Sequence, residues 1–342
     1  MKDKTKIKYN PFVSIICVTY NRRHFFQSFF QCIRNQDYPA SRYEVIIVDD
    51  GTDKVKDLVL EANIPQVKYF ELSEKMTLGK KRNYSHTLID KRTQFITYFD
   101  DDDYHHPSRI SHAVEMLLKN PKALCAGSSE LYVYFKHIKQ MYQFGPYGPN
   151  HATAGTFTFR RELLNDTMYE DKACLAEEKF FLKNWTVPFI QLDPMKTILV
   201  ISHEHNTFDK KNLLINSNPE LAKESLKTID SFISRKNETK IKNFFLTDID
   251  DLLKNYELGE PKHKPDVLKQ IVEFNLERDR IQRNLTKQCQ VCITKPNGEE
   301  QVLSNDEIVN ILIQQQDNIT MLTKQLSVYK QILLTNNIAF EI

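Results

Sequence analysis

The chain has 342 residues, of which 41% are hydrophobic, and 47 basic against 45 acidic side chains give a formal net charge of +2. The length allows a core of about 200 residues and a second, smaller part. The balanced charge argues against nucleic acid as a partner, and no apolar run reaches the roughly 18 residues that span a bilayer. The basic N-terminus lacks a signal-peptide pattern, so we expect a cytoplasmic protein without disulfide bonds.

Residues 10–215 alternate between strand and helix patterns, and we interpret them as one catalytic domain. Apolar runs predict strands, and amphipathic segments between them predict helices. The predicted strands are 12–18, 43–48, 67–72, 95–99, 131–135, 154–159 and 197–202, and the predicted helices are 22–35, 54–62, 79–90, 108–119 and 177–184. Strands separated by helices imply an α/β fold with a mainly parallel central sheet and helices on both faces.

The remainder of the chain carries fewer candidate site residues. Residues 216–260 are expected to form a helical extension with helices at 219–235 and 240–256, followed by a linker at 260–265. Residues 261–342 are expected to form a helical and hairpin region, with a helix at 267–287, a turn at Pro296-Asn297-Gly298 and a helix at 306–337. Truncation before residue 261 is therefore expected to spare ligand binding.

The last predicted helix carries an apolar stripe with a repeat of seven residues, formed by Leu312, Ile319, Leu326 and Leu333. Such a stripe is typical of a coiled coil, which could join copies of the chain into a homo-oligomer. A helix that packs into a core of its own chain is the alternative. Cys289 and Cys292 form an isolated Cys-x-x-Cys motif. No further cysteine or histidine follows at the spacing of a zinc site, so we do not expect zinc there.

Four consecutive aspartates, Asp100 to Asp103, follow the apolar run 95–99. Crowded carboxylates at a strand end repel one another unless a cation neutralises them. Hard divalent cations such as Mg²⁺ and Mn²⁺ bind carboxylate oxygens and bridge phosphates, and open α/β sheets bind ligands beyond the carboxyl ends of their strands. The tetrad therefore predicts a metal and diphosphate site, with a solvated acidic turn as the alternative.

Four short segments, in this order and spacing, resemble the motifs of family 2 glycosyltransferases with the GT-A fold. They are VTYNR at 18–22, VDDGT at 48–52, GKKRN at 79–83 and YFDDDD at 98–103. The resemblance covers roughly residues 10–210. It implies a Rossmann-like nucleotide half, an acceptor half after the Asp-x-Asp motif, and inverting transfer of a sugar from a nucleoside diphosphate donor.

The resemblance also assigns roles to residues of the nucleotide half. The expected nucleotide-sugar contacts are Thr19, Tyr20, Asn21, Asp49 or Asp50, Arg82, Asn83, Asp100 and Asp101. By the same resemblance Asp102 is the metal ligand, although the run of four aspartates leaves the register open by one residue. His203 is expected to complete the Mn²⁺ or Mg²⁺ site, with His205 as the alternative, because histidine is a common metal ligand.

An inverting transfer needs a general base for the acceptor hydroxyl. The family supplies it from an acidic pair at a helix start, which here corresponds to Glu177 and Glu178. Glu178 lies at the position of the base, where the family usually has an aspartate. Because of this difference, Glu177 stays an alternative candidate for the base. An acidic first turn that only complements the helix dipole is the alternative.

Together these features predict a metal-dependent inverting glycosyltransferase that uses a nucleotide sugar, expected to be a UDP-sugar, and a hydroxyl on a glycan, protein or small molecule. A nucleotidyltransferase also uses carboxylates, metal and a parallel sheet, but it has no need of Glu178. A non-catalytic glycosyltransferase-like scaffold with a coiled-coil oligomeriser is the second alternative.

Overall fold

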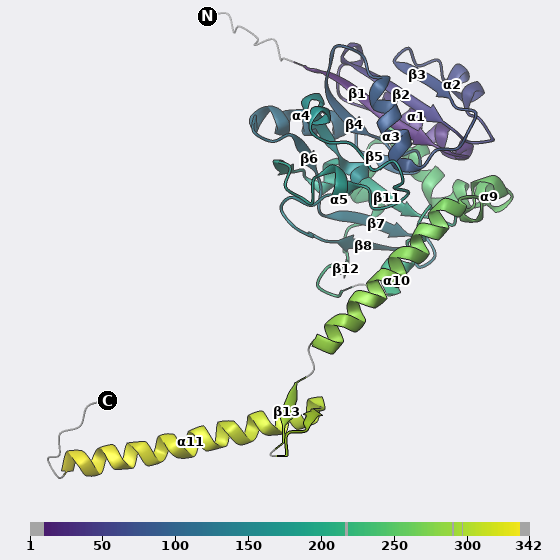
Figure 1. Cartoon of the computed structure of the whole chain (residues 1–342). Helices are drawn as coiled ribbons and strands as arrows, with labels where there is room; N and C mark the ends of the chain where they lie inside the picture. The colour runs from purple at the N-terminus through teal and green to yellow at the C-terminus, as the bar shows by residue number, and fades with distance from the viewer. Residues whose placement is uncertain (1–9, 216–217, 289–290, 296, 336–342) are drawn as a thin grey trace, which may run out of the picture. The chain divides into compact units, whose positions relative to one another are not determined.

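A computed structural model describes residues 10–215, 218–288, 291–295 and 297–335 (Figure 1). The chain divides into two compact units, Met1–Ile271 and Val272–Ile342. The first unit contains both sheets of the α/β part, and the second contains the hairpin and the last helix. The region 216–271, predicted to lie outside the catalytic domain, belongs to the first unit.

In the described part of the first unit, seven strands form the central sheet in the order β10-β6-β9-β4-β1-β2-β3. These strands are β1 (Phe12–Thr19), β2 (Tyr43–Asp49), β3 (Val67–Glu71), β4 (Thr93–Tyr98), β6 (Cys125–Gly127), β9 (Thr158–Arg160) and β10 (Phe189–Gln191). β1 is parallel to both β2 and β4, whereas β9 is antiparallel to β4 and β6. The expected α/β class with a mainly parallel sheet is confirmed.

Helices cover both faces of this sheet. Strand side chains alternate between the two faces, and β1 carries apolar side chains on both, so each face needs a covering layer. In β1, Val13, Ile15 and Cys17 pack with apolar residues of helices α1 and α4, while Ile16 packs on the opposite face with residues near α3 and α5. The helices are α1 (Phe26–Arg34), α2 (Lys56–Ala62), α3 (Leu78–Thr87), α4 (Arg109–Lys119) and α5 (Glu178–Phe181). Apart from α5, they lie close to the predicted helices.

Two predictions near the site need correction. The helix expected at 177–184 stops after Phe181, since Lys183, Asn184 and Trp185 have φ angles of 49°, 53° and 67° in the left-handed region. The strand expected at 154–159 begins instead as a 3₁₀ turn, Ala154–Thr156, and only then enters β9. The turn brings Gly155 so close to Asp100 that a Cβ on Gly155 would lie 2.7 Å from Asp100 Oδ2.

A second sheet of five strands, in the order β12-β8-β7-β11-β5, completes the described part of the first unit. Its strands are β5 (Tyr104–His105), β7 (Leu131–Phe135), β8 (Gln140–Phe144), β11 (Ile198–Ser202) and β12 (Ala222–Glu224). The helix predicted at 219–235 is wrong, because residues 222–224 pair with β8 and only α7 (Ile229–Phe232) is helical there. Tertiary pairing overrides helix propensity at this position.

The helix predicted at 240–256 is confirmed in outline. It consists of α8 (Thr239–Asn243), a π-helical turn (Phe244–Asp248) and α9 (Ile249–Lys254). The linker predicted at 260–265 is wrong, since residues 257–259 and 261–263 form 3₁₀ turns and Lys264 is only 5% exposed. This segment leads directly into α10 (Pro265–Gln288).

The described part of the second unit contains the antiparallel strands β13 (Cys292–Thr294) and β14 (Glu300–Val302) and the long helix α11 (Asn305–Thr335). α11 contains no buried residue, and Leu312 and Ile319 of the predicted stripe are 63% and 56% exposed. The last two residues of the predicted helix, 336 and 337, lie outside the described residues, as do Pro296 and Cys289. Self-association of the stripe stays a prediction.

Two further expectations concern membranes and disulfides. None of the described helices combines the length and the apolar character needed to cross a bilayer. The described cysteines that carry free thiols are Cys17, Cys32, Cys125, Cys174 and Cys292.

Candidate functional site

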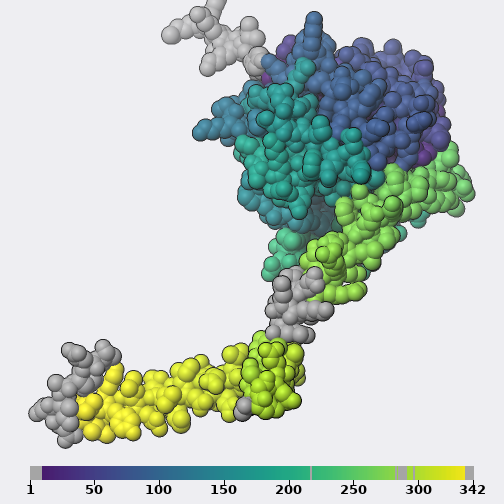
Figure 2. Space-filling model, viewed as in Figure 1, coloured from purple at the N-terminus to yellow at the C-terminus, as the bar shows by residue number. Residues whose placement is uncertain are grey.

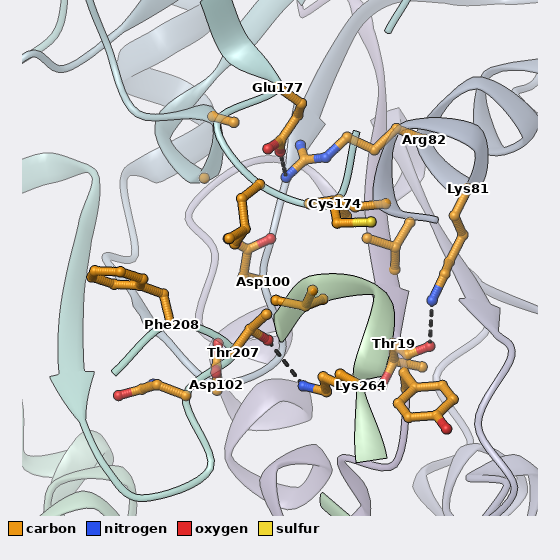
Figure 3. A pocket seen from close by; sticks show the side chains of 18 of the residues that line it. Thr19, Lys81, Arg82, Asp100, Asp102, Cys174, Glu177, Thr207, Phe208 and Lys264 are labelled. Carbon is orange, nitrogen blue, oxygen red and sulfur yellow. Dashed lines mark hydrogen bonds and ion pairs between the residues drawn. The ribbon is translucent and has the colours of Figure 1, made fainter. Parts of the chain in front are cut away.

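A pocket of about 320 Å³ lies beyond the carboxyl ends of β1 and β4 (Figure 3). Because parallel strands end at the same edge of the sheet, Thr19 and the aspartate tetrad reach one pocket from different loops. Loops after β3 and β11, the segment before α5, the turn at 153–155 and residues 264–267 contribute further walls. Of the predicted site residues, the pocket lining includes Thr19, Tyr20, Arg82, Asp100, Asp101, Asp102, Glu177 and Glu178.

The aspartate tetrad lines the pocket with carboxylates that differ in their ionisation. Burial and the neighbouring Asp102 raise the pKa of Asp101 to about 7. Burial also raises the pKa of Asp100, where Arg82 opposes the effect, and that of Asp103, where Asp102 adds to it. A bound cation would be needed to keep these buried, neighbouring carboxylates ionised together, which fits a site for a cation.

Asp102 is the exception in the tetrad. Its Oδ2 lies 3.5 Å from Arg22 Nη2 and 3.4 Å from His203 Nε2. Burial opposes ionisation of Asp102, but Arg22 and His203 outweigh it and lower its pKa. Asp102 is thus the carboxylate of the tetrad that stays ionised most readily.

His203 presents a ring nitrogen to Asp102 from the turn after β11. The His205 backbone N–H donates to His203 Nδ1, and the His203 Nε2 edge faces Asp102 and Asn206. Burial lowers the pKa of His203 to about 4, so the imidazole is neutral at pH 7. Neither histidine is among the residues that line the pocket, but His203 contacts Asp102, which does line it. The alternative ligand, His205, instead stacks its ring on Tyr256 with centroids 6.1 Å apart.

The donor atoms at this position fit a divalent cation. Asp102 supplies a carboxylate oxygen, and Asp101 Oδ2 is buried without a hydrogen-bond partner among the described residues. His203 Nε2 faces Asp102, but it carries the proton of the neutral ring because Nδ1 accepts the His205 N–H, so this nitrogen would bind a cation only after giving up that proton. In the part of the chain that the structure describes, no three His, Cys, Asp or Glu side chains are grouped as a metal site. Two protein ligands with additional oxygens from a bound diphosphate match the way in which Mg²⁺ is commonly held.

The two candidate bases have different surroundings. Glu177 Oε1 lies 2.9 Å from Arg82 Nη2, and both side chains are buried. The Arg82 guanidinium also lies 4.2 Å from the centroid of the Tyr98 ring, which fixes its position. Glu178 is half-buried, lines the pocket and has no ion-pair partner in the described part of the chain, and burial and the neighbouring Glu177 raise its pKa to about 7.

The loop after β1 places Thr19 and Tyr20 in the pocket wall but turns Asn21 away. Two lysines lie near the Tyr20 ring, with Lys75 Nζ and Lys81 Nζ at 5.3 and 5.9 Å from its centroid. Asn21 adopts a φ of 51°, and its Oδ1 accepts hydrogen bonds from the Thr52 and Asp53 backbone. Asn21 therefore shapes the loop rather than lining the pocket.

Asp49 and Asp50, at the end of β2, are not among the residues that line the pocket. The Asp49 carboxylate accepts bonds from the backbone N–H groups of Gly51 and Val55, so it holds the local turn. Asp50 forms a buried ion pair with Lys81, a residue that does line the pocket. Of the two alternatives, Asp50 is therefore the one linked to the pocket.

Asn83 lies outside the pocket lining, unlike its neighbour Arg82. Its Nδ2 donates to Tyr169 O at 2.8 Å and to Asp171 Oδ1 at 2.9 Å. Its Oδ1 accepts from Tyr169 N at 2.9 Å. These bonds attach α3 to the loop that precedes the acidic pair.

Several basic residues of the pocket were not predicted from the sequence. They are Arg22, Lys75, Lys81, Lys210 and Lys264. Arg22 directly follows the predicted Thr19-Tyr20-Asn21 loop, so its position was a usable signal. Lys264 carried no such signal, because it sits in a short Pro-bounded segment that resembles a linker.

Comparisons with known proteins relate this chain to glycosyltransferases. Residues 14–179 match the family model described as Glycosyl transferase family 2. The GalNAc(5)-diNAcBac-PP-undecaprenol beta-1,3-glucosyltransferase of Campylobacter jejuni is 32% identical over 96 residues, or 27% of this chain and 30% of that protein. WcaA of Escherichia coli K12, named as a colanic acid biosynthesis glycosyl transferase, is 32% identical over 108 residues, or 31% of this chain and 37% of WcaA.

Among solved structures, the mannosyltransferase PcManGT from Pyrobaculum calidifontis, in complex with GDP-Man and Mn²⁺, aligns with a TM-score of 0.47 and 14% identity. That alignment covers 82% of this chain and 84% of the mannosyltransferase. The chain spans about a third of the length of the curated relatives described above.

Proposed function

Because this chain belongs to glycosyl transferase family 2 through residues 14–179, we propose that it transfers a sugar from a nucleoside diphosphate donor to an acceptor hydroxyl with inversion. The donor is proposed to be a UDP-sugar. The observation that carries the proposal is the convergence of Glu178 with Asp100–Asp103 in one pocket, although about 75 residues of chain separate them.

The acidic pair divides the tasks of charge pairing and proton transfer. Glu177 is held by Arg82 at 2.9 Å, whereas Glu178 has a pKa of about 7 and can exchange a proton near neutral pH. A group with a pKa near the operating pH is suited to act as a general base. Glu178 is therefore the proposed base, and Glu177 the residue that positions Arg82.

The proposed reaction is an in-line displacement. Glu178 accepts the proton of the acceptor hydroxyl as that oxygen forms a bond to the anomeric carbon. The bond from the anomeric carbon to the diphosphate oxygen breaks on the opposite face, and the electron pair leaves with the nucleoside diphosphate. Arg22 and Lys210 provide positive charge at the pocket wall, which favours the developing anion.

A divalent cation is part of the proposal. Asp102 and His203 would hold Mn²⁺ or Mg²⁺, which would neutralise the charge of the leaving diphosphate. The nucleotide half would be bound by Thr19, Tyr20, Arg82, Asp100 and Asp101, with Asp50 acting through Lys81.

The test is a screen of nucleotide sugars for metal-dependent release of nucleoside diphosphate, with the Glu178→Gln variant as a matched control. Release of a nucleoside diphosphate by the wild-type protein, strongly reduced in the variant, is the expected result. Release of pyrophosphate from a nucleoside triphosphate would instead indicate a nucleotidyltransferase. Binding of nucleotide sugars without turnover of any kind would favour a non-catalytic scaffold.

A further inference from the structure

We propose that Lys264, contributed by the segment that follows the catalytic fold, binds the diphosphate of the donor. This inference rests on the proposed function and assigns a donor-binding role to residues 256–271, here called the strap. The strap belongs to the first unit and lies against its N-terminal part (Figure 2).

The strap contacts several loops that build the pocket. The Tyr256 hydroxyl donates to Asp53 Oδ2 at 2.7 Å, and Asn21 Nδ2 donates to the Leu258 carbonyl at 3.1 Å. Asp266 forms an ion pair with Lys75. These contacts attach the strap to the loops that follow β1, β2 and β3.

The strap also holds the loop that leads to the acidic pair. Gln270 Oε1 accepts hydrogen bonds from the backbone N–H groups of Cys174 and Leu175, both at 2.8 Å. Cys174 and Leu175 line the pocket, as do Lys264, Asp266 and Val267 of the strap itself. The strap is therefore a wall of the donor pocket.

Lys264 is the buried cation of this wall. It is 5% exposed, and its Nζ donates to Thr207 Oγ1 at 2.9 Å (Figure 3). Among the described residues, no carboxylate oxygen lies within 4.0 Å of Lys264 Nζ, in contrast to Lys81, which pairs with Asp50. A buried ammonium group without a counter-ion is unfavourable, so its position calls for an anion.

A second cation converges on the same hydroxyl. Arg22 Nη2 lies 3.4 Å from Thr207 Oγ1, and Arg22 Nη1 is buried without a hydrogen-bond partner among the described residues. Thr207 thus holds an ammonium and a guanidinium side by side at the pocket wall. Paired cationic donors of this kind suit the adjacent phosphates of a diphosphate.

The experiment measures binding of UDP and of uridine to the full-length protein by titration calorimetry, after confirming with UDP and GDP that the wild-type protein binds a nucleoside diphosphate. If GDP is the ligand, guanosine replaces uridine. Lys264→Met keeps the apolar stem and removes the charge, and Lys264→Arg keeps the charge. Lys262→Met is the matched control, because Lys262 lies on the same strap but is exposed and pairs with Glu260 at 3.0 Å.

Lys264→Met is expected to weaken diphosphate binding by about 10-fold or more, because a charge-assisted hydrogen bond is lost. Nucleoside binding should stay unchanged, Lys264→Arg should bind UDP within about threefold of wild type, and Lys262→Met should bind like wild type. The melting temperature of Lys264→Met should be level or higher, since an uncompensated buried charge is removed.

Two outcomes would overturn the inference while leaving the proposed function in place. Equal UDP affinity in wild type and Lys264→Met would show that Lys264 does not bind the diphosphate. If Lys264→Met bound UDP and uridine with equally reduced affinity and melted at a lower temperature, Lys264 would only support the fold. Absence of any nucleoside diphosphate binding by the wild-type protein would instead overturn both proposals.

Discussion

Arg82 Nη2 lies 2.9 Å from Glu177 Oε1, and this buried ion pair joins α3 to the residue that directly precedes α5. Residues 95 positions apart in the sequence are thereby brought together. The pair neutralises the charge of Glu177, whereas its neighbour Glu178 forms no ion pair with any residue that the structure describes. This asymmetry distinguishes two glutamates that look equivalent in the sequence.

Exchange of each glutamate for glutamine should separate catalysis from structure. Glu178→Gln should lower turnover by about 10² or more and leave the melting temperature near that of wild type, because only proton acceptance is lost. Glu177→Gln should destabilise the fold by on the order of 3 kcal/mol, because the buried Arg82 loses its counter-ion. Thermal melting and steady-state kinetics measure the two effects, and a reversed pattern would make Glu177 the base.

The rate should depend on pH through Glu178. Burial and Glu177 raise the pKa of Glu178 to about 7, and a base must be deprotonated to act. Below about pH 7 the protonated fraction grows, so kcat/KM should rise with pH and level off above about pH 8. Initial rates at constant ionic strength test this, and a profile that is flat from about pH 5 to 8 would contradict the role of Glu178.

Asp101 should make stability depend on pH. Burial and the neighbouring Asp102 raise its pKa in the folded protein to about 7, above the ordinary value of 3.8, so the fold loses stability as pH rises through this range. Asp101→Asn should therefore raise stability at pH 8 by on the order of 2 kcal/mol, and by much less at pH 5. Denaturant unfolding in EDTA provides the measurement. An equal effect at both pH values would mean that Asp101 does not titrate between them.

Removal of divalent cations should weaken donor binding. The aspartate tetrad repels a diphosphate until a cation neutralises it, so UDP should bind wild-type protein more weakly in EDTA than with Mn²⁺. Asp102→Ala should abolish transfer and remove this difference. Because Asp102 contacts Arg22 and His203, the variant should also lose some stability, contrary to the simple relief of repulsion that the sequence suggests. Equal affinity of the wild-type protein in EDTA and Mn²⁺ would exclude the metal role in donor binding.

Two truncations should separate the strap from the last helix. A chain ending at residue 271 keeps the strap, and it should bind UDP like the full-length protein. A chain ending at residue 260 loses Lys264, Asp266 and Val267 from the pocket wall and should bind UDP more weakly, contrary to the expectation from the sequence. Calorimetry on both chains, with circular dichroism as the folding control, gives the comparison.

The same truncation at residue 271 tests the predicted coiled coil. The exposed stripe of α11, which includes Leu312 and Ile319, is expected to associate with a second copy. The full-length protein should then be an oligomer by light scattering and the shorter chain a monomer. Two monomers would rule out self-association through α11.

The sequence by itself determined the parts of the fold that depend on local pattern. Apolar runs of strand length and the helices between them follow from periodicity, and the position of Asp100 after a buried strand follows from the same reading. The central parallel sheet was predictable for this reason. The pairing of residues 222–224 with β8 was not, because a short strand is selected by its partner rather than by its own propensity.

Only the tertiary structure decided which charged residues share the pocket. Glu177 is paired through Arg82, and Lys264 comes from a segment 245 positions after Thr19. The sequence pattern places a residue on a face of its own helix or strand, but it does not say which distant loop that face will meet. The electrostatics of Glu178 and Lys264 are set by such distant neighbours and by burial, so they depend on the folded chain.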